Sequence, residues 1–123
     1  MKFVRDIPAD GATRIIRGYD ASSITTNDGV ITSSTLIAAG ALEPWPPRTL
    51  SELTAEHIDL LLAHDPELLL IGTGAKFALP PQPALAAARA RRIGIEVMDT
   101  AAACRTYNVL VGEGRRVVAG LML

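Results

Sequence analysis

Aromatic residues, cysteines and an excess of either charge are scarce in this chain of 123 residues. Aromatic side chains make up 4% of the sequence although hydrophobic residues make up 49%, so the core must be aliphatic. A single cysteine forms no internal disulfide, which fits a reducing compartment. The 12 basic and 13 acidic residues leave a net charge of −1, which disfavours generic binding to nucleic acid.

Long apolar segments are also missing. The longest uncharged apolar stretch is Leu36–Leu42, far short of the roughly 20 residues that cross a bilayer, so we predict no direct membrane insertion. The first residues, Met1–Pro8, have neither an apolar signal-peptide core nor a cleavage site of small residues. We therefore expect a single cytoplasmic domain over residues 1–123.

The most informative segment is Leu68–Ala75, which reads Leu-Leu-Leu-Ile-Gly-Thr-Gly-Ala. Four consecutive large aliphatic residues are typical of a central strand in a parallel sheet, buried on both faces. The Gly-Thr-Gly turn follows where that strand ends, and open α/β sheets bind ligands outside the carboxyl ends of their strands. The octet therefore predicts an architecture and the edge at which a ligand would bind.

The residues after Leu68 alternate between strand-like and helix-like patterns. We predict strands over Leu68–Ile71, Ile95–Met98 and Val117–Leu123, and helices over Ala84–Arg92, capped by Gly94, and Thr100–Val111. This βαβαβ order predicts an α/β fold with right-handed crossovers, in which at least the first two strands are parallel.

The first third of the chain is rich in β-branched residues. Ile24–Thr26 and Val30–Thr32 flank Asn27-Asp28-Gly29, a tight-turn sequence, and are predicted to form a hairpin. The front strands would either extend the central sheet or form a smaller layer against it. Between the two halves, Thr54 is expected to cap a helix that Asp65-Pro66 ends.

Two candidate binding features lie at the carboxyl edge of the sheet. The Gly72-Thr73-Gly74 turn, with Lys76 just after it, resembles a phosphate-cradling loop, because glycines let backbone N–H groups approach an anion. Phe77 stands where a dinucleotide loop has its third glycine, so a purely geometric turn is favoured over nucleotide binding. Asp99 follows the next strand, and capping of the following helix is its favoured role.

The predicted Thr100–Val111 helix has an apolar face that includes Tyr107, with Cys104 at its margin. Arg105 and Asn108 are assigned to the opposite, solvated side, where together they could grip a carboxylate or a partner's backbone. Tyr107 is expected in the core with one partner for its hydroxyl, and Cys104 is expected to be an inert apolar residue.

Trp45 lies between prolines and would either line a partner's groove or, as we favour, plug one end of the core. His57 and His64 share a helix without clustered cysteines or carboxylates, which disfavours a metal site. No paired catalytic carboxylates are evident. We assign no catalytic, cofactor-binding or metal-ligating residues.

Five segments together resemble a known family. They are Pro44-Trp45-Pro46, Leu70-Ile71-Gly72-Thr73-Gly74, Gly94-Ile95-Glu96-Val97-Met98-Asp99-Thr100, Ala103-Cys104-Arg105-Thr106-Tyr107-Asn108 and Glu113-Gly114-Arg115-Arg116-Val117-Val118-Ala119. The chain resembles the domain-of-unknown-function family that includes the mitochondrial respiratory complex I assembly factor 3 of the alpha-subcomplex and the adipogenesis-associated domain protein. It looks most like the free-standing bacterial members, since no mitochondrial presequence precedes Met1.

The resemblance implies a compact three-layer α/β fold with a mixed central sheet, no established enzyme activity and no catalytic set. For the mitochondrial relatives it implies assembly of a membrane-bound respiratory complex through protein contacts, which reaches this chain by analogy. The first hypothesis is therefore a protein-binding or assembly module, with a surface formed by Trp45, the Gly72–Phe77 turn, Arg105 and Asn108. The alternative is a small-molecule sensor or enzyme with a pocket between Gly72-Thr73-Gly74 and Asp99. A homo-oligomer is compatible with both.

Overall fold

The computed structural model describes residues 2–3 and 13–123 of the chain. Its elements are β1 (Lys2–Phe3), β2 (Ile16–Tyr19), β3 (Ile24–Thr26), β4 (Gly29–Ile31), β5 (Thr35–Ala38), β6 (Ala41–Pro44), α1 (Ala55–Leu62), β7 (Leu68–Gly72), α2 (Ala86–Ala90), β8 (Gly94–Met98), α3 (Thr100–Gly112) and β9 (Val117–Leu121). Short 3₁₀ turns occur at Leu50–Glu52 and Gln82–Leu85. Among the described helices, none combines the length and apolar character needed to span a bilayer.

The central sheet has five strands in the order β6-β5-β9-β7-β8. β7 is parallel to both β9 and β8, whereas β5 is antiparallel to β9 and β6. The predicted mixed sheet and C-terminal βαβαβ unit are therefore confirmed. Both alternatives for the front strands occur, because β5 and β6 extend the central sheet while β1–β4 form a second sheet in that order.

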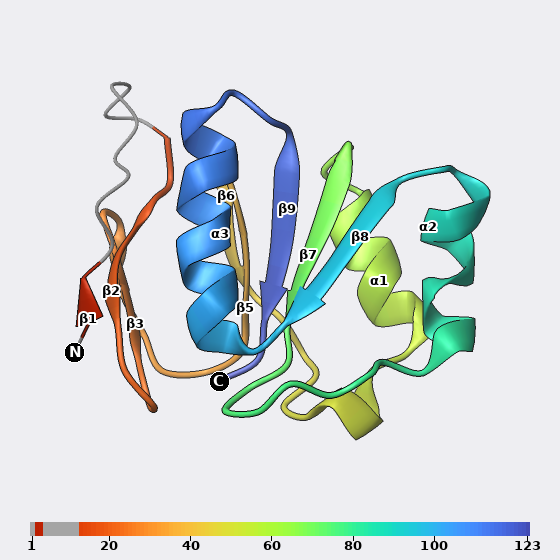
Figure 1. Ribbon diagram of the computed structural model, residues 1–123, viewed down its shortest axis with the longest axis horizontal. Coiled ribbons are helices and arrows are strands. Elements are labelled where there is room, and N and C mark those ends of the chain that lie inside the picture. Colours follow the sequence, from red (N-terminus) through yellow and green to blue (C-terminus); the bar gives the residue numbers. More distant parts are fainter. Residues whose placement is uncertain (1, 4–12) are drawn as a thin grey trace.

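The central sheet has an apolar core on each of its two faces, and helices cover both cores. In β7, Leu69 and Ile71 belong to the core beneath α1 and α2, whereas Leu68 and Leu70 belong to the core beneath α3. All five residues of this strand are buried, as the aliphatic run predicts. α1 and α2 cover one face and α3 covers the other, and the small sheet packs against the outer side of α3 (Figure 1).

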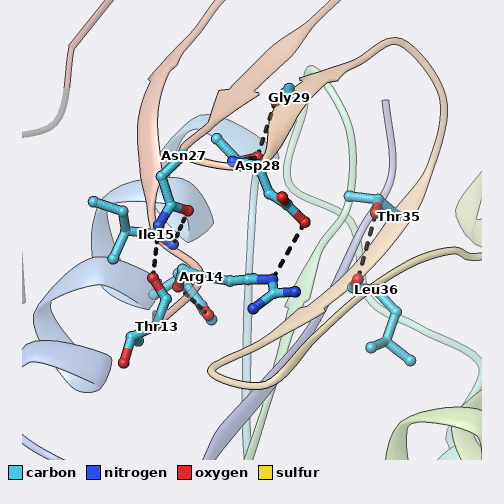
Figure 2. Close-up of polar contacts among 10 residues, drawn as sticks. Thr13, Arg14, Ile15, Asn27, Asp28, Gly29, Thr35 and Leu36 are labelled. Carbon is cyan, nitrogen blue, oxygen red and sulfur yellow. Dashed lines mark hydrogen bonds and ion pairs between the residues drawn. The ribbon is translucent and has the colours of Figure 1, made fainter. Parts of the chain in front are cut away.

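The β3–β4 hairpin is confirmed, and its turn is bonded to the chain before β2 (Figure 2). The Asn27 side chain accepts from the Ile15 N–H at 3.0 Å and donates to the Thr13 carbonyl at 2.8 Å. Asp28 lies 3.4 Å from the Arg14 guanidinium, an ion pair drawn in the same view. The turn therefore fixes the entry of the chain into the small sheet.

The predicted cap at the start of α1 agrees with the structure, whereas the predicted cap at the end of α2 does not. Thr54 caps α1 as predicted, since its hydroxyl accepts from the His57 N–H at 3.4 Å and His57 Nδ1 accepts from the Thr54 N–H at 3.1 Å. The predicted cap at Gly94 is wrong. The left-handed residue after α2 is Arg92, with φ 57°, and the Ile93 N–H donates to the Ala88 carbonyl as in a Schellman motif.

Candidate functional site

The carboxyl ends of β7 and β9 meet in a hydrogen-bond network centred on Thr100. Thr100 Oγ1 donates to the Met122 carbonyl at 2.6 Å and accepts from the Gly74 N–H at 2.8 Å. The Thr100 N–H donates to the Gly74 carbonyl, and the Met122 N–H donates to the Gly72 carbonyl, both at 2.9 Å. This network fixes the turn after β7 against the start of α3.

The Gly72-Thr73-Gly74 turn has a geometric role. The Thr73 N–H donates to the Met98 carbonyl at 2.9 Å and the Gly74 N–H is bonded to Thr100, so two donors that a phosphate loop would offer are already used. Gly74 has φ 98°, and a Cβ at Gly72 would lie 2.9 Å from Thr100 Oγ1. Glycine is thus required by the chain path at both positions.

Asp99 caps α3, because its Oδ1 accepts from the Ala102 N–H at 2.8 Å. The favoured capping role is confirmed. The carboxylate therefore has a structural partner at the sheet edge, next to Thr100, and a capping aspartate of this kind typically stabilises a protein by about 1 kcal/mol.

A cleft of about 410 Å³ opens beside the Thr100 network. Its lining is mainly apolar and comes from β1, the end of β2 and the turn after it, the turn after β7, the start of α3 and the segment after β9. The lining residues are Lys2, Tyr19, Asp20, Ala21, Gly74, Ala75, Thr100, Ala101, Met122 and Leu123. Small-ligand pockets commonly have volumes of about 300–1,000 Å³. A cleft of suitable size therefore lies at the edge to which the glycine turn points, although only Gly74 and Ala75 of the predicted binding surface line it.

Asp20, at one end of the cleft, has its carboxylate engaged by the turn in which it lies. Oδ1 accepts from the N–H groups of Ser22 and Ser23, both at 2.9 Å. The Ser22 N–H contributes most to holding the pKa of Asp20 below its ordinary value. This carboxylate therefore stays ionised at neutral pH.

The assignment of Asn108 to a solvated helix face is wrong. Its side chain is fully buried between α3 and β2, where Oδ1 accepts from the Ile16 N–H at 2.9 Å and Nδ2 donates to the Ile16 carbonyl at 2.6 Å. The small sheet packs against the outer side of α3, so the part of that side that contains Asn108 is also buried. Asn108 thus completes the backbone bonding of β2.

Arg105 is exposed as predicted, yet its guanidinium has an internal partner. It donates to the Tyr19 hydroxyl of β2 at 2.5 Å. Arg105 and Asn108 therefore do not form one polar grip, because each is bonded separately to the small sheet.

Trp45 is buried with 3% of its surface exposed, and its indole N–H donates to the His57 carbonyl at 3.1 Å. Its ring lies over Gly120 of β9, where an added Cβ would come within 2.6 Å of the indole. The favoured interpretation of Trp45 as a plug of the core is confirmed, and we do not include it in a binding surface.

Burial suppresses the ionisation of two side chains on α3. It raises the pKa of the Cys104 thiol to about 12 and raises that of Tyr107 as well. Cys104 is fully buried, and the Tyr107 hydroxyl donates to the Arg14 carbonyl at 2.8 Å. The predictions of an apolar, buried Cys104 and of a core tyrosine with one hydroxyl partner are confirmed.

The loop after the glycine turn carries several exposed side chains. Lys76 is exposed, and so are two large apolar residues, Phe77 at 57% and Leu79 at 74%. Among residues 2–3 and 13–123, no group of three or more His, Cys, Asp and Glu side chains is placed to hold a metal ion. His57 completes the capping box of α1 with Thr54, and His64 lies 3.1 Å from Glu43.

Sequence reasoning missed Thr100 and Tyr19, which position the residues it did select. Thr100 directly follows the capping residue Asp99 at the end of β8, and this position after a strand is the signal that the sequence offers. Tyr19 stands at the end of a short strand, and nothing local to it indicates a contact with Arg105, 86 residues away.

Comparison with known proteins decides the family. Residues 16–122 match the family described as protein of unknown function, DUF498/DUF598. The chain belongs to this family. One relative is a Danio rerio protein named NADH dehydrogenase (ubiquinone) 1 alpha subcomplex assembly factor 3, as the resemblance anticipates. It is 28% identical to this chain over 113 residues, which are 90% of this chain and 65% of that protein.

Two other relatives of the chain extend the comparison. A Francisella tularensis protein named 13 kDa major membrane protein is 40% identical over 68 residues, 55% of each chain. The crystal structure of a Bordetella parapertussis protein has a TM-score of 0.86 at 34% identity and covers 94% of this chain and 98% of that one. The chain thus spans 55% and 65% of the lengths of the Francisella and Danio relatives.

Proposed function

We propose that this DUF498/DUF598 chain is a protein-binding module of the assembly type. The observation that carries the proposal is the likeness to the Danio rerio assembly factor, which extends over 90% of the chain. Exposed Phe77 and Leu79 support it, because two large apolar side chains in one loop favour a contact with another protein. Lys76, in the same loop, belongs to the proposed surface.

By analogy with that relative, the proposed partner is a subunit of a respiratory or other membrane-bound complex. The cytoplasmic location is part of this proposal, and so is the chain's action on the complex through protein contacts. A homo-oligomer is compatible with it, and light scattering on the purified chain measures that directly.

The test is a pull-down with tagged chain from lysate that includes solubilised membranes. We expect wild type to recover one subunit in stoichiometric amount, and Phe77→Ser/Leu79→Ser to recover about tenfold less. Val30→Ser is the matched control, because Val30 is 64% exposed on the small sheet, away from this loop. If folded wild-type chain repeatedly recovers no specific protein, this result would contradict the proposed protein-binding function.

A second candidate, a small-molecule sensor or enzyme, is favoured by the cleft of about 410 Å³ beside Thr100. A ligand that binds only the folded chain raises its thermal midpoint by mass action. Nucleotides, carboxylates and sugar phosphates are the compounds to screen, with Ala75→Trp as a variant that fills the cleft. A midpoint shift in wild type that is lost in Ala75→Trp supports this candidate, and no shift with any compound contradicts it.

A further inference from the structure

β8 is an edge strand with one free side. It is last in the order of the central sheet, and none of the strands in the described part of the chain pairs with its outer edge (Figure 1). The other edge strand, β6, ends at Pro44, which has no N–H to offer. The outer edge of β8 is therefore the better place for an added strand.

The register shows which backbone groups of β8 are free. The Gly94 N–H donates to the Glu67 carbonyl and the Met98 carbonyl accepts from the Thr73 N–H, so both residues bond toward β7. Backbone direction alternates along a strand, so the N–H and carbonyl groups of Ile95 and Val97 point away from the sheet. These four groups are those that pair with a peptide strand added to a sheet.

A groove with both apolar and polar lining accompanies this edge. It has a volume of about 210 Å³ and lies between α2 and β8, with Leu79, Ile93, Ile95 and Val97 among its lining residues. Leu79 is 74% exposed. A strand laid along β8 would place alternate side chains over this groove, and apolar side chains there would cover Leu79.

Three arginines stand at the start of the same edge. Arg89, Arg91 and Arg92 are exposed, and none of them takes part in the ion pairs found within residues 2–3 and 13–123. Arg89 also lines the groove and donates to Gln82 at 2.7 Å. The positive charge of these arginines therefore favours a bound segment that carries acidic side chains.

We propose that the outer edge of β8 binds an extended segment of another protein, with apolar residues at alternate positions and acidic residues next to Arg89, Arg91 and Arg92. The inference rests on the protein-binding function and assigns its contact surface. A second copy of the chain fits less well, because its own β8 would bring a single acidic side chain, Glu96.

A displayed library of random ten-residue segments, selected on the folded wild-type chain, provides the probe. We expect enriched segments to alternate apolar residues and to carry acidic ones. Val97→Pro removes an outward N–H and no bond to β7, a position where an edge strand tolerates proline, and should weaken binding by about tenfold or more. Val97→Thr keeps the N–H and is the matched control.

Arg92→Gly tests the charge separately. Arg92 has φ 57°, a conformation that glycine adopts freely, so this variant keeps the fold while removing one cation. Weaker binding of the acidic segments to Arg92→Gly supports the proposal. Failure to enrich any segment, or enrichment of segments that bind Val97→Pro and Arg92→Gly as well as wild type, overturns it.

Further outcomes distinguish a failure of the β8-edge proposal from a failure of the proposed protein-binding function. A wild-type dimer that Val97→Pro dissociates would make a second copy the occupant and overturn the proposal. If Val97→Pro recovers the pulled-down subunit as well as wild type does, the edge proposal fails while the protein-binding function stands. If folded wild type recovers no subunit, the function fails and the inference with it.

Discussion

α3 and β8 lie at different places in the fold and use their polar groups in opposite ways. On α3, the Asn108 amide is bonded to Ile16 and the Tyr107 hydroxyl to the Arg14 carbonyl, because the helix is packed between two sheets. On β8, the backbone of Ile95 and Val97 faces outward beside arginines that have no ion pair in the described structure. A polar motif on a helix can therefore be wholly structural, whereas an edge strand presents backbone donors and acceptors whatever its side chains are.

The largest expected effect is on the α3 side of this comparison. Asn108→Leu keeps the number and branching of the side-chain heavy atoms but leaves the buried N–H and carbonyl of Ile16 without a partner. Since each of the two unsatisfied buried groups costs about 1–3 kcal/mol, we expect the free energy of unfolding to fall by about 2–6 kcal/mol in a denaturant titration. Val109→Ala on the exposed side should change it by less than about 0.5 kcal/mol. Equal stability of Asn108→Leu and wild type would contradict the account of α3.

The second-largest expected effect concerns Trp45, which is buried in the core on the other face of the central sheet. Gly120→Ala would place a Cβ 2.6 Å from the Trp45 ring, and overpacking of this kind costs about 1–3 kcal/mol. Thermal unfolding measures the loss, with Gly40→Ala as control because a Cβ there meets no atom within 4 Å. Adding Trp45→Phe to Gly120→Ala should restore part of the midpoint, and no restoration would argue against the ring as the obstacle.

A smaller effect appears as a pH dependence of α3. The pKa of Cys104 is raised to about 12 in the folded chain, whereas an unperturbed thiol titrates near pH 9. Above pH 9 the unfolded chain loses this proton and the folded chain keeps it, so unfolding is favoured as pH rises from 9 to 12. Cys104→Ala should show a shallower loss of stability over this window. Parallel pH profiles for the two chains would contradict the burial of the thiol.

The smallest effect lies at the start of the β8 edge. Arg92→Gly relieves a left-handed backbone and should raise the free energy of unfolding by about 0.5 kcal/mol. Arg91 has φ −85°, so Arg91→Gly gains nothing in this way and is the control. Should both variants lose stability equally, the turn would not be strained at Arg92.

The sequence predicts those parts of the fold that depend on local pattern. The aliphatic run Leu68–Ile71 predicts a strand buried on both faces, and Thr54 and Asp99 mark the starts of their helices because capping is a property of a few adjacent residues. The Asn27-Asp28-Gly29 turn identifies its hairpin in the same way. These features need no knowledge of distant contacts.

The parts that sequence could not predict depend on packing between distant segments. A helix wheel assumes one covered face, so it assigns Asn108 to solvent, whereas the small sheet covers that side of α3. The sequence pattern predicts the cap of α2 at Gly94, because glycine is the usual left-handed residue there, whereas Arg92 is the residue with positive φ. The free edge of β8 depends on strand order, which no segment of the sequence encodes locally.

The most direct test of the difference between α3 and β8 is the recovery of the partner subunit by three tagged chains: wild type, Arg105→Ala and Val97→Pro. Arg105 represents the exposed side of α3, and Val97 the open edge. We predict equal recovery by wild type and Arg105→Ala, and about tenfold less by Val97→Pro. Loss in Arg105→Ala with full recovery by Val97→Pro would place the contact on α3 and contradict the account.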